Sequence, residues 1–247
     1  MADLKTREWT PVPAPIWPQQ SPIDLREPTY HVSNLDTLLQ FNYQQPVKGT
    51  LGDDHEVHLD ADSPAHVLFD GVSCPLIKLH FHRPSEHLVD GIPAFMEVHL
   101  VHEIPTSAGM PSEKVVVAVF IDDARNATSV QGDTKGLHIV KRLSAFASHV
   151  FNKGTDHRFD EIHLQDLLPN TDQQKDFWHY EGSLTTPGFD EYVSWIVLHE
   201  HATLDEQTSK ELAEHPKSAR PVQPLSRRFV LRSFPLPGEV VPAQKPG

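Results

Sequence analysis

The chain has 247 residues, a formal net charge of −13 from 34 acidic and 21 basic residues, and a single cysteine, Cys74. This length suits one large domain, so we expect a single domain over residues 1–247, with a core of about 19–234 and proline-rich extended ends. The acidic balance argues against a nucleic-acid or anionic-membrane partner, since both need clustered Lys and Arg. A lone cysteine excludes an intrachain disulfide. The sequence contains no run of 18 apolar residues, so it predicts no membrane-spanning helix. The lack of a secretory signal and the single cysteine favour the cytoplasm; a removed signal peptide would leave a periplasmic or secreted location open.

Short apolar runs that alternate with turn residues predict strands through the middle of the chain. The expected strands are Leu38 to Tyr43, Glu56 to Leu59, His66 to Phe69, Leu76 to His82, Ala94 to His102 and Lys114 to Ile121. The β-branched run Val115 to Val117 favours a strand that is buried on both faces. Apolar residues at three- and four-residue steps predict a helix from Ile139 to Val150. Thr203 and Glu206 are spaced like a capping box, which predicts a helix that runs to about Glu214. The predicted fold is mainly β, with peripheral short helices.

Three histidines on two expected strands form a candidate metal site. His80 and His82 are two residues apart, so both point to the same face of their strand. If the strand that carries His99 is a neighbour, the three imidazoles can converge on one point and leave a fourth ligand position open. Glu97, two residues before His99, is the type of residue that accepts a hydrogen bond from a ligand histidine. A surface pair or a core pair of histidines is the alternative for His80 and His82.

The spacing His80-x-His82-x-x-x-Glu86 also occurs in cupin barrels, where the glutamate is a metal ligand. A second cupin signature, with a Pro-x-Gly turn shortly before a histidine, is not found in this sequence. A cupin-type iron or manganese enzyme that acts on a small organic substrate is therefore a rival hypothesis with weaker support.

Six blocks, in the right order, resemble the α-class carbonic anhydrases. They are Gln20 to Asp24, Leu79 to Gly91, Met96 to His102, Gly182 to Pro187, Trp195 to Leu198 and Arg220 to Leu225. The resemblance implies a central, twisted, mostly antiparallel sheet with Zn²⁺ at the base of a conical cleft. It also implies the reversible hydration of carbon dioxide to bicarbonate and a proton by a zinc-bound hydroxide. His80, His82 and His99 match the zinc ligands, and carbonic anhydrase is itself the known example of a three-histidine catalytic site.

The resemblance assigns roles to further residues. Glu86 and Thr185 match the pair that orients the hydroxide, and Thr186 matches a polar position beside the substrate. The apolar wall where carbon dioxide rests is matched by Val101, Val116, Leu184, Val193 and Trp195. His55 aligns with the proton-shuttle histidine, and the nearby His58 is an alternative for that role.

Lys78 departs from the family pattern, in which a glutamine commonly accepts a hydrogen bond from the first zinc histidine. An ammonium group cannot accept a hydrogen bond. We therefore expect that Lys78 turns away and water replaces the acceptor, or that the metal site is weakened. A relative that has lost catalysis is a second hypothesis, supported by Lys78 alone. The short Arg83–Ser85 loop is similar to that of bacterial members, by analogy with which a homodimer is open.

Overall fold

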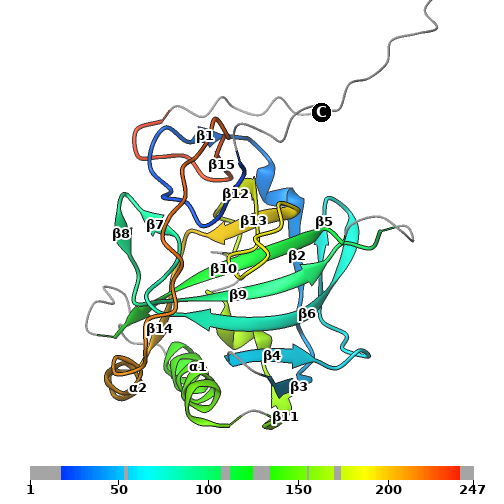
Figure 1. Ribbon diagram of the computed structural model, residues 1–247, viewed down its shortest axis with the longest axis vertical. Helices are drawn as coiled ribbons and strands as arrows, with labels where there is room; N and C mark the ends of the chain where they lie inside the picture. Colours follow the sequence, from blue (N-terminus) through cyan, green and yellow to red (C-terminus); the bar gives the residue numbers. More distant parts are fainter. Residues whose placement is uncertain are drawn as a thin grey trace, which may run out of the picture.

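The computed structural model describes residues 18–52, 55–106, 112–124, 134–154, 156–169 and 174–239, with side chains omitted for 134–138. Within these residues one 13-stranded sheet has the order β1-β15-β12-β13-β10-β9-β6-β4-β3-β11; β14 also pairs with β10, and β2 joins through β5 to β6 (Figure 1). The strands are β1 Tyr30–His31, β2 Leu39–Asn42, β3 Val47–Leu51, β4 Glu56–Leu59, β5 His66–Phe69, β6 Val72–His82, β7 Leu88–Val89, β8 Ile92–Pro93, β9 Met96–Glu103, β10 Lys114–Asp123, β11 Arg158–Ile162, β12 Phe177–Gly182, β13 Val193–Leu198, β14 Ala202–Leu204 and β15 Leu231–Arg232.

Most strand pairs in the large sheet are antiparallel, and parallel pairing occurs where β10 meets β13 and β14 and where β1 meets β15. Helix α1 spans Thr134–Asn152 and α2 spans Glu206–Leu212, and short 3₁₀ helices η1 and η3 span Leu35–Leu38 and Leu164–Leu167. Figure 1 shows α1 and α2 packed together beside β14, at one end of the sheet. The prediction of a mainly β fold with peripheral helices is confirmed.

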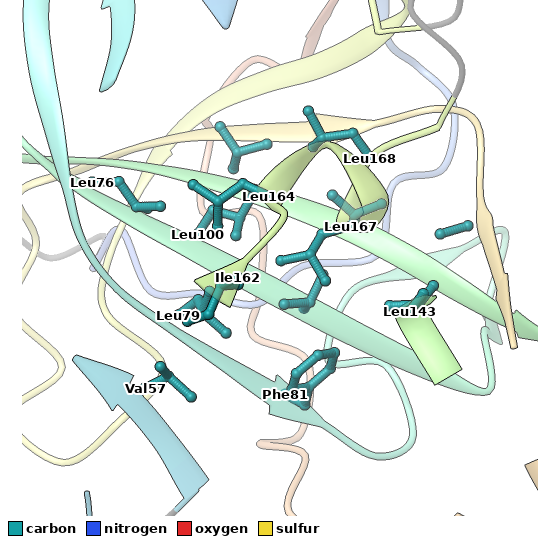
Figure 2. Close-up of a cluster of buried hydrophobic side chains, with 14 of the residues drawn as sticks. Val57, Leu76, Leu79, Phe81, Leu100, Leu143, Ile162, Leu164, Leu167 and Leu168 are labelled. Carbon is teal, nitrogen blue, oxygen red and sulfur yellow. The ribbon is translucent and has the colours of Figure 1, made fainter. Parts of the chain in front are cut away.

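Strand β10 separates two hydrophobic cores. Its odd-numbered apolar residues from Val115 to Ile121 belong to one core, and Val116, Ala118 and Phe120 belong to the other. This alternation follows from the two-residue period of a strand, and it confirms the predicted burial on both faces. Figure 2 shows the first core, where β6 and β9 side chains meet Leu143 of α1 and the η3 segment.

The second core lies on the opposite face of the sheet. It includes Ile23 and Leu25 from the early part of the chain and Val230 and Phe234 from its late part. The described segments near both ends of the chain therefore cover the face of the sheet that lies opposite the first core.

The observed elements differ from the predictions at several boundaries. β4 and β5 begin and end as predicted, whereas β6 starts earlier, at Val72. The predicted capping box is wrong: Thr203 lies in β14, and the N-cap of α2 is Asp205, whose carboxylate accepts a hydrogen bond from the Thr208 N–H at 2.8 Å. The proline-rich ends at 1–17 and 240–247 lie outside the described residues, so their extended form and the single domain stay predictions. Neither helix in the described part of the chain combines the length and apolar character needed to span a bilayer.

Candidate metal centre

The register of β6 against β9 brings the three candidate histidines together. His80 lies directly opposite His99, and His82 lies opposite Glu97. Opposed residues of an antiparallel pair point to the same face of the sheet, so the three imidazoles share one face. Leu79 and Phe81 point to the other face and pack in the first core (Figure 2). The predicted neighbourhood of the two strands is confirmed.

The three imidazoles form a group that could hold a metal ion. One ring nitrogen from each of His80, His82 and His99 lies within 4.8 Å of the others. His80, His82 and His99 are 7%, 6% and 1% exposed, and both ring nitrogens of His80 and of His82 are buried without a hydrogen-bond partner. Buried polar atoms are normally paired. Because a neutral imidazole has one N–H and one lone-pair nitrogen, a metal ion would satisfy one nitrogen of each ring. Burial lowers the pKa of His80 and lowers that of His82 to about 3, which keeps both rings neutral, the form that binds a metal.

Glu97 is fully buried and accepts four hydrogen bonds. Its Oε1 accepts from His99 Nε2 at 2.9 Å and from His87 Nδ1 at 2.6 Å, and its Oε2 accepts from the backbone N–H groups of Glu86 and His87 at 2.8 and 2.9 Å. Burial alone would raise the pKa of the Glu97 carboxyl, but the two histidines hold it well below its usual value. The bond from Nε2 fixes the tautomer of His99 and leaves its Nδ1 available to a metal.

His87 is a part of this network that the sequence reasoning missed. Its ring is fully buried, and its Nε2 lies 2.7 Å from the Tyr180 hydroxyl, which donates to Ser21 Oγ at 2.9 Å. It also packs edge-on against Trp195, with 4.9 Å between ring centroids. Its position beside Glu86 in the block Leu79 to Gly91 was the only signal, and nothing local distinguishes it from a surface histidine.

Glu86 and Thr185, predicted as a pair, are both buried and lie close together. Glu86 Oε1 accepts from the Arg220 backbone N–H at 2.8 Å and lies 3.4 Å from His82 Nδ1. Burial raises the pKa of the Glu86 carboxyl, and the Thr185 hydroxyl and the Arg220 N–H oppose that rise. Glu86 Oε2 is buried without a hydrogen-bond partner.

The predicted apolar wall occupies one row across three strands. Val101 of β9 is paired with Val116 of β10, which is paired with Trp195 of β13. All three are buried in the second core together with Val193, and Leu184 packs against them. The Trp195 ring lies 4.9 Å from the His99 ring, so the wall borders the histidine cluster directly.

A sequence model of eukaryotic-type carbonic anhydrases matches residues 5–234 of the chain. The chain belongs to the eukaryotic-type carbonic anhydrase family. A carbonic anhydrase of Nostoc sp. is 32% identical to it over 226 residues, which cover 87% of this chain and 76% of that protein. Carbonic anhydrase Nec1 of Nesocodon mauritianus is 31% identical over 85% of this chain and 73% of its own length.

Solved structures agree with this family. The α-carbonic anhydrase of Photobacterium profundum matches with a TM-score of 0.68 and 27% identity, over 86% of this chain and 88% of that chain. The α-carbonic anhydrase of Thermovibrio ammonificans, solved with the inhibitor sulfanilamide, matches with a TM-score of 0.65, also at 27% identity, over 86% of each chain. The chain is therefore a carbonic anhydrase in sequence and fold, and the cupin hypothesis is wrong.

A cleft of about 400 Å³ leads to the histidines of this carbonic anhydrase. Its lining includes His80 and His82, the predicted substrate neighbour Thr186, and two further histidines, His55 and His215. His55 Nδ1 donates to the carbonyl of Val150 at 3.1 Å. The rings of His55 and His215 lie 5.3 and 5.2 Å from the Phe151 ring. His215 had not been predicted, because it is far from the other site residues in the chain.

The structure places His58 and Lys78 next to one carboxylate. Lys78 Nζ lies 2.7 and 2.8 Å from the two oxygens of Glu56, and His58 Nε2 lies 3.5 Å from one of them. A partner from β4 thus holds the Lys78 ammonium group, and the alternatives that water replaces the acceptor or that the metal site is weakened stay predictions.

Proposed function

We propose that this carbonic anhydrase hydrates carbon dioxide reversibly to bicarbonate and a proton, with one Zn²⁺ held by His80, His82 and His99. The observation that carries the proposal is the convergence of three buried imidazoles, two of which have no hydrogen-bond partner for their ring nitrogens. When bound, zinc would supply a hydroxide at neutral pH, because in carbonic anhydrases it lowers the pKa of a bound water to about 7.

Glu97 has the role of orienting His99 in this proposal. Its carboxylate accepts the Nε2 proton at 2.9 Å and thereby keeps Nδ1 unprotonated. The same carboxylate holds the backbone N–H of Glu86 at 2.8 Å, so one buried acid positions both a metal ligand and the next functional side chain.

Glu86 and Thr185 align the reacting water in this proposal. A hydroxyl that donates its one hydrogen to Glu86 has only acceptor capacity toward that water. The reacting water would then donate to Thr185 Oγ. This hydrogen bond would aim a lone pair of the water oxygen at the substrate carbon. The Arg220 N–H at 2.8 Å supports this arrangement, because it fixes Glu86 Oε1.

The substrate and the released proton are handled by different sides of the site. Carbon dioxide has no charge and suits the apolar row of Val101, Val116 and Trp195, with Thr186 at the polar side. We assign the proton exit to His55, because it lines the cleft and its Nδ1 bond to Val150 leaves Nε2 for water. Histidine is a common proton shuttle in enzymes, which suits transfer to buffer.

A stopped-flow assay of carbon dioxide hydration, with and without a zinc chelator, tests the proposal. Activity that the chelator removes and added zinc restores is expected, together with one zinc per chain by metal analysis. The His99→Ala variant, measured beside it, is expected to lose both zinc and activity. Substoichiometric zinc that added metal does not restore would instead support a relative that has lost catalysis. The homodimer stays a prediction, which sedimentation equilibrium measures.

A further inference from the structure

The strand register places Glu56 opposite His80, a candidate zinc ligand. In the β4–β6 pair, Glu56 is directly opposite His80, and the neighbouring pair is His58 with Lys78. Opposed residues share one face of the sheet, so Glu56, Lys78 and His80 lie on the same face. Glu56 is among the residues that line this cleft, together with His80 and His82.

The distances identify Glu56 as the polar group that faces His80 Nδ1. The Glu56 Oε1 atom lies 3.8 Å from His80 Nδ1, a nitrogen that is buried without a hydrogen-bond partner. An N–H···O bond has a heavy-atom distance of about 2.9–3.0 Å, so a movement of less than about 1 Å closes this contact. The side chains of His80 and Glu56 are 8% and 18% exposed, so little water competes for the nitrogen.

Lys78 holds the Glu56 carboxylate in place and compensates its charge. Its Nζ is 2.7 Å from one carboxylate oxygen and 2.8 Å from the other, and its side chain is 25% exposed. An unpaired ammonium beside His80 would repel a cation held by that ring, whereas a paired one leaves the Glu56–Lys78 couple with no net charge. Oε1, the oxygen closer to Nζ, is also the oxygen that faces His80.

We propose that Glu56 is a positioning residue for the metal centre. Its carboxylate accepts a hydrogen bond from His80 Nδ1, and Lys78 holds this carboxylate in place and neutralises its charge. The inference rests on the proposed zinc site. A carboxylate that accepts from a ligand histidine fixes the ring tautomer and makes the metal-binding nitrogen a stronger base. Here Nε2 of His80 is the nitrogen that remains for the metal. The pair thus supplies an acceptor for His80 without a net charge beside the metal, which neither Lys78 alone nor an unpaired carboxylate would do.

The test is the zinc dissociation constant of four variants, measured by competition with a chromophoric chelator. Glu56→Ala removes the acceptor and leaves the Lys78 ammonium unpaired, so we expect zinc binding to weaken at least about 10–100-fold, the range for loss of such a partner. Glu56→Ala with Lys78→Ala removes the repulsion as well and is expected to recover part of the loss. Glu56→Gln keeps an acceptor oxygen and is expected to bind zinc more tightly than Glu56→Ala. The matched control is Glu103→Ala, which breaks a comparable pair with Lys114 at 3.0 Å and should leave zinc binding unchanged.

A second readout follows the proposed hydrogen bond itself. In the zinc-loaded protein the Nδ1 proton of His80 should give a downfield NMR signal that Glu56→Ala shifts upfield or broadens, whereas Glu103→Ala leaves it in place. Zinc binding by Glu56→Ala within about twofold of the unchanged protein, or an equal loss in Glu103→Ala, would overturn the role of Glu56 alone. An unchanged protein that binds no zinc would overturn the proposed function and this inference together.

Discussion

Replacement of Glu97 by glutamine tests the buried network under the histidines with almost no change of shape. The carboxylate accepts two ring N–H groups at one oxygen and two backbone N–H groups at the other. An amide has one acceptor oxygen and one NH₂ group, so it can serve only one of these pairs. The amide oxygen must face the rings if His99 is to keep its proton on Nε2 and its Nδ1 free.

The cost of Glu97→Gln therefore falls on the zinc-loaded protein. With the oxygen toward the rings, the NH₂ group faces the backbone N–H groups of Glu86 and His87, and two buried donors lose their acceptor. Each such loss costs about 1–3 kcal/mol, so we expect the zinc-loaded protein to lose about 2–6 kcal/mol. In the metal-free protein the amide can turn over and His99 can change tautomer, so the loss is smaller. The difference between the two states equals a loss of zinc affinity, tenfold for each 1.4 kcal/mol.

Urea unfolding of both states, together with zinc competition, measures the two losses. The control is Glu181→Gln, because the Glu181 side chain is 56% exposed and accepts from Ser194 at 2.9 Å. It should stay within about 0.5 kcal/mol of the unchanged protein. If zinc-loaded Glu97→Gln also stayed within that margin, the reasoning about the buried acceptor would be refuted.

Three further predictions concern packing, pH and proton exit. Gly182→Ala would place a Cβ against a buried serine hydroxyl and 2.9 Å from a tryptophan ring, so it should cost about 1–3 kcal/mol in urea unfolding, whereas Gly154→Ala, with nothing within 4 Å, should cost little. Burial lowers the pKa of His102 from about 6.5 to about 4. Its contribution to folding stability is therefore present above pH 6.5 and is lost as the pH falls toward 4, about 3 kcal/mol in all. In the metal-free state, the free energy of unfolding of His102→Gln should fall less over that pH range than that of the unchanged protein. Parallel curves of unfolding free energy against pH would contradict this. His55→Ala should lower turnover in weak buffer by roughly 100-fold, with recovery in imidazole; a loss in His215→Ala alone would assign the proton exit to His215 instead.

The parts of the site that were predictable from the sequence depend on local periodicity. The two-residue spacing of His80 and His82 determines that they share a face, and the apolar Leu79 and Phe81 between them indicate which face is the core. The resemblance of six ordered blocks supplied the rest, including Glu86 and Thr185, whose types alone would fit a surface acid and a turn threonine.

The parts that were not predictable depend on strand register and on partners that are distant in the chain. Glu56 meets Lys78 and His80 only because β4 pairs with β6 in one particular register, across 22 residues of sequence. A shift of one residue would send Glu56 to the opposite face. The prediction of the α2 cap was wrong for a local reason. Thr203 pairs with β10 as part of β14, so Asp205 is the first residue after that strand and caps the helix.

The burial of β10 on both faces has a consequence for how metal leaves the protein. β10 is hydrogen-bonded to β9 on one side and to β13 and β14 on the other, and seven consecutive residues from Val115 to Ile121 are at most 1% exposed. Backbone amides in such a position exchange with solvent only through global unfolding. His99 is carried by β9, the strand next to this most protected one, so fraying at the sheet margins does not loosen it. Zinc should therefore depart through the open cleft, at a rate set by chelator access and ligand protonation and largely independent of denaturant below the unfolding transition.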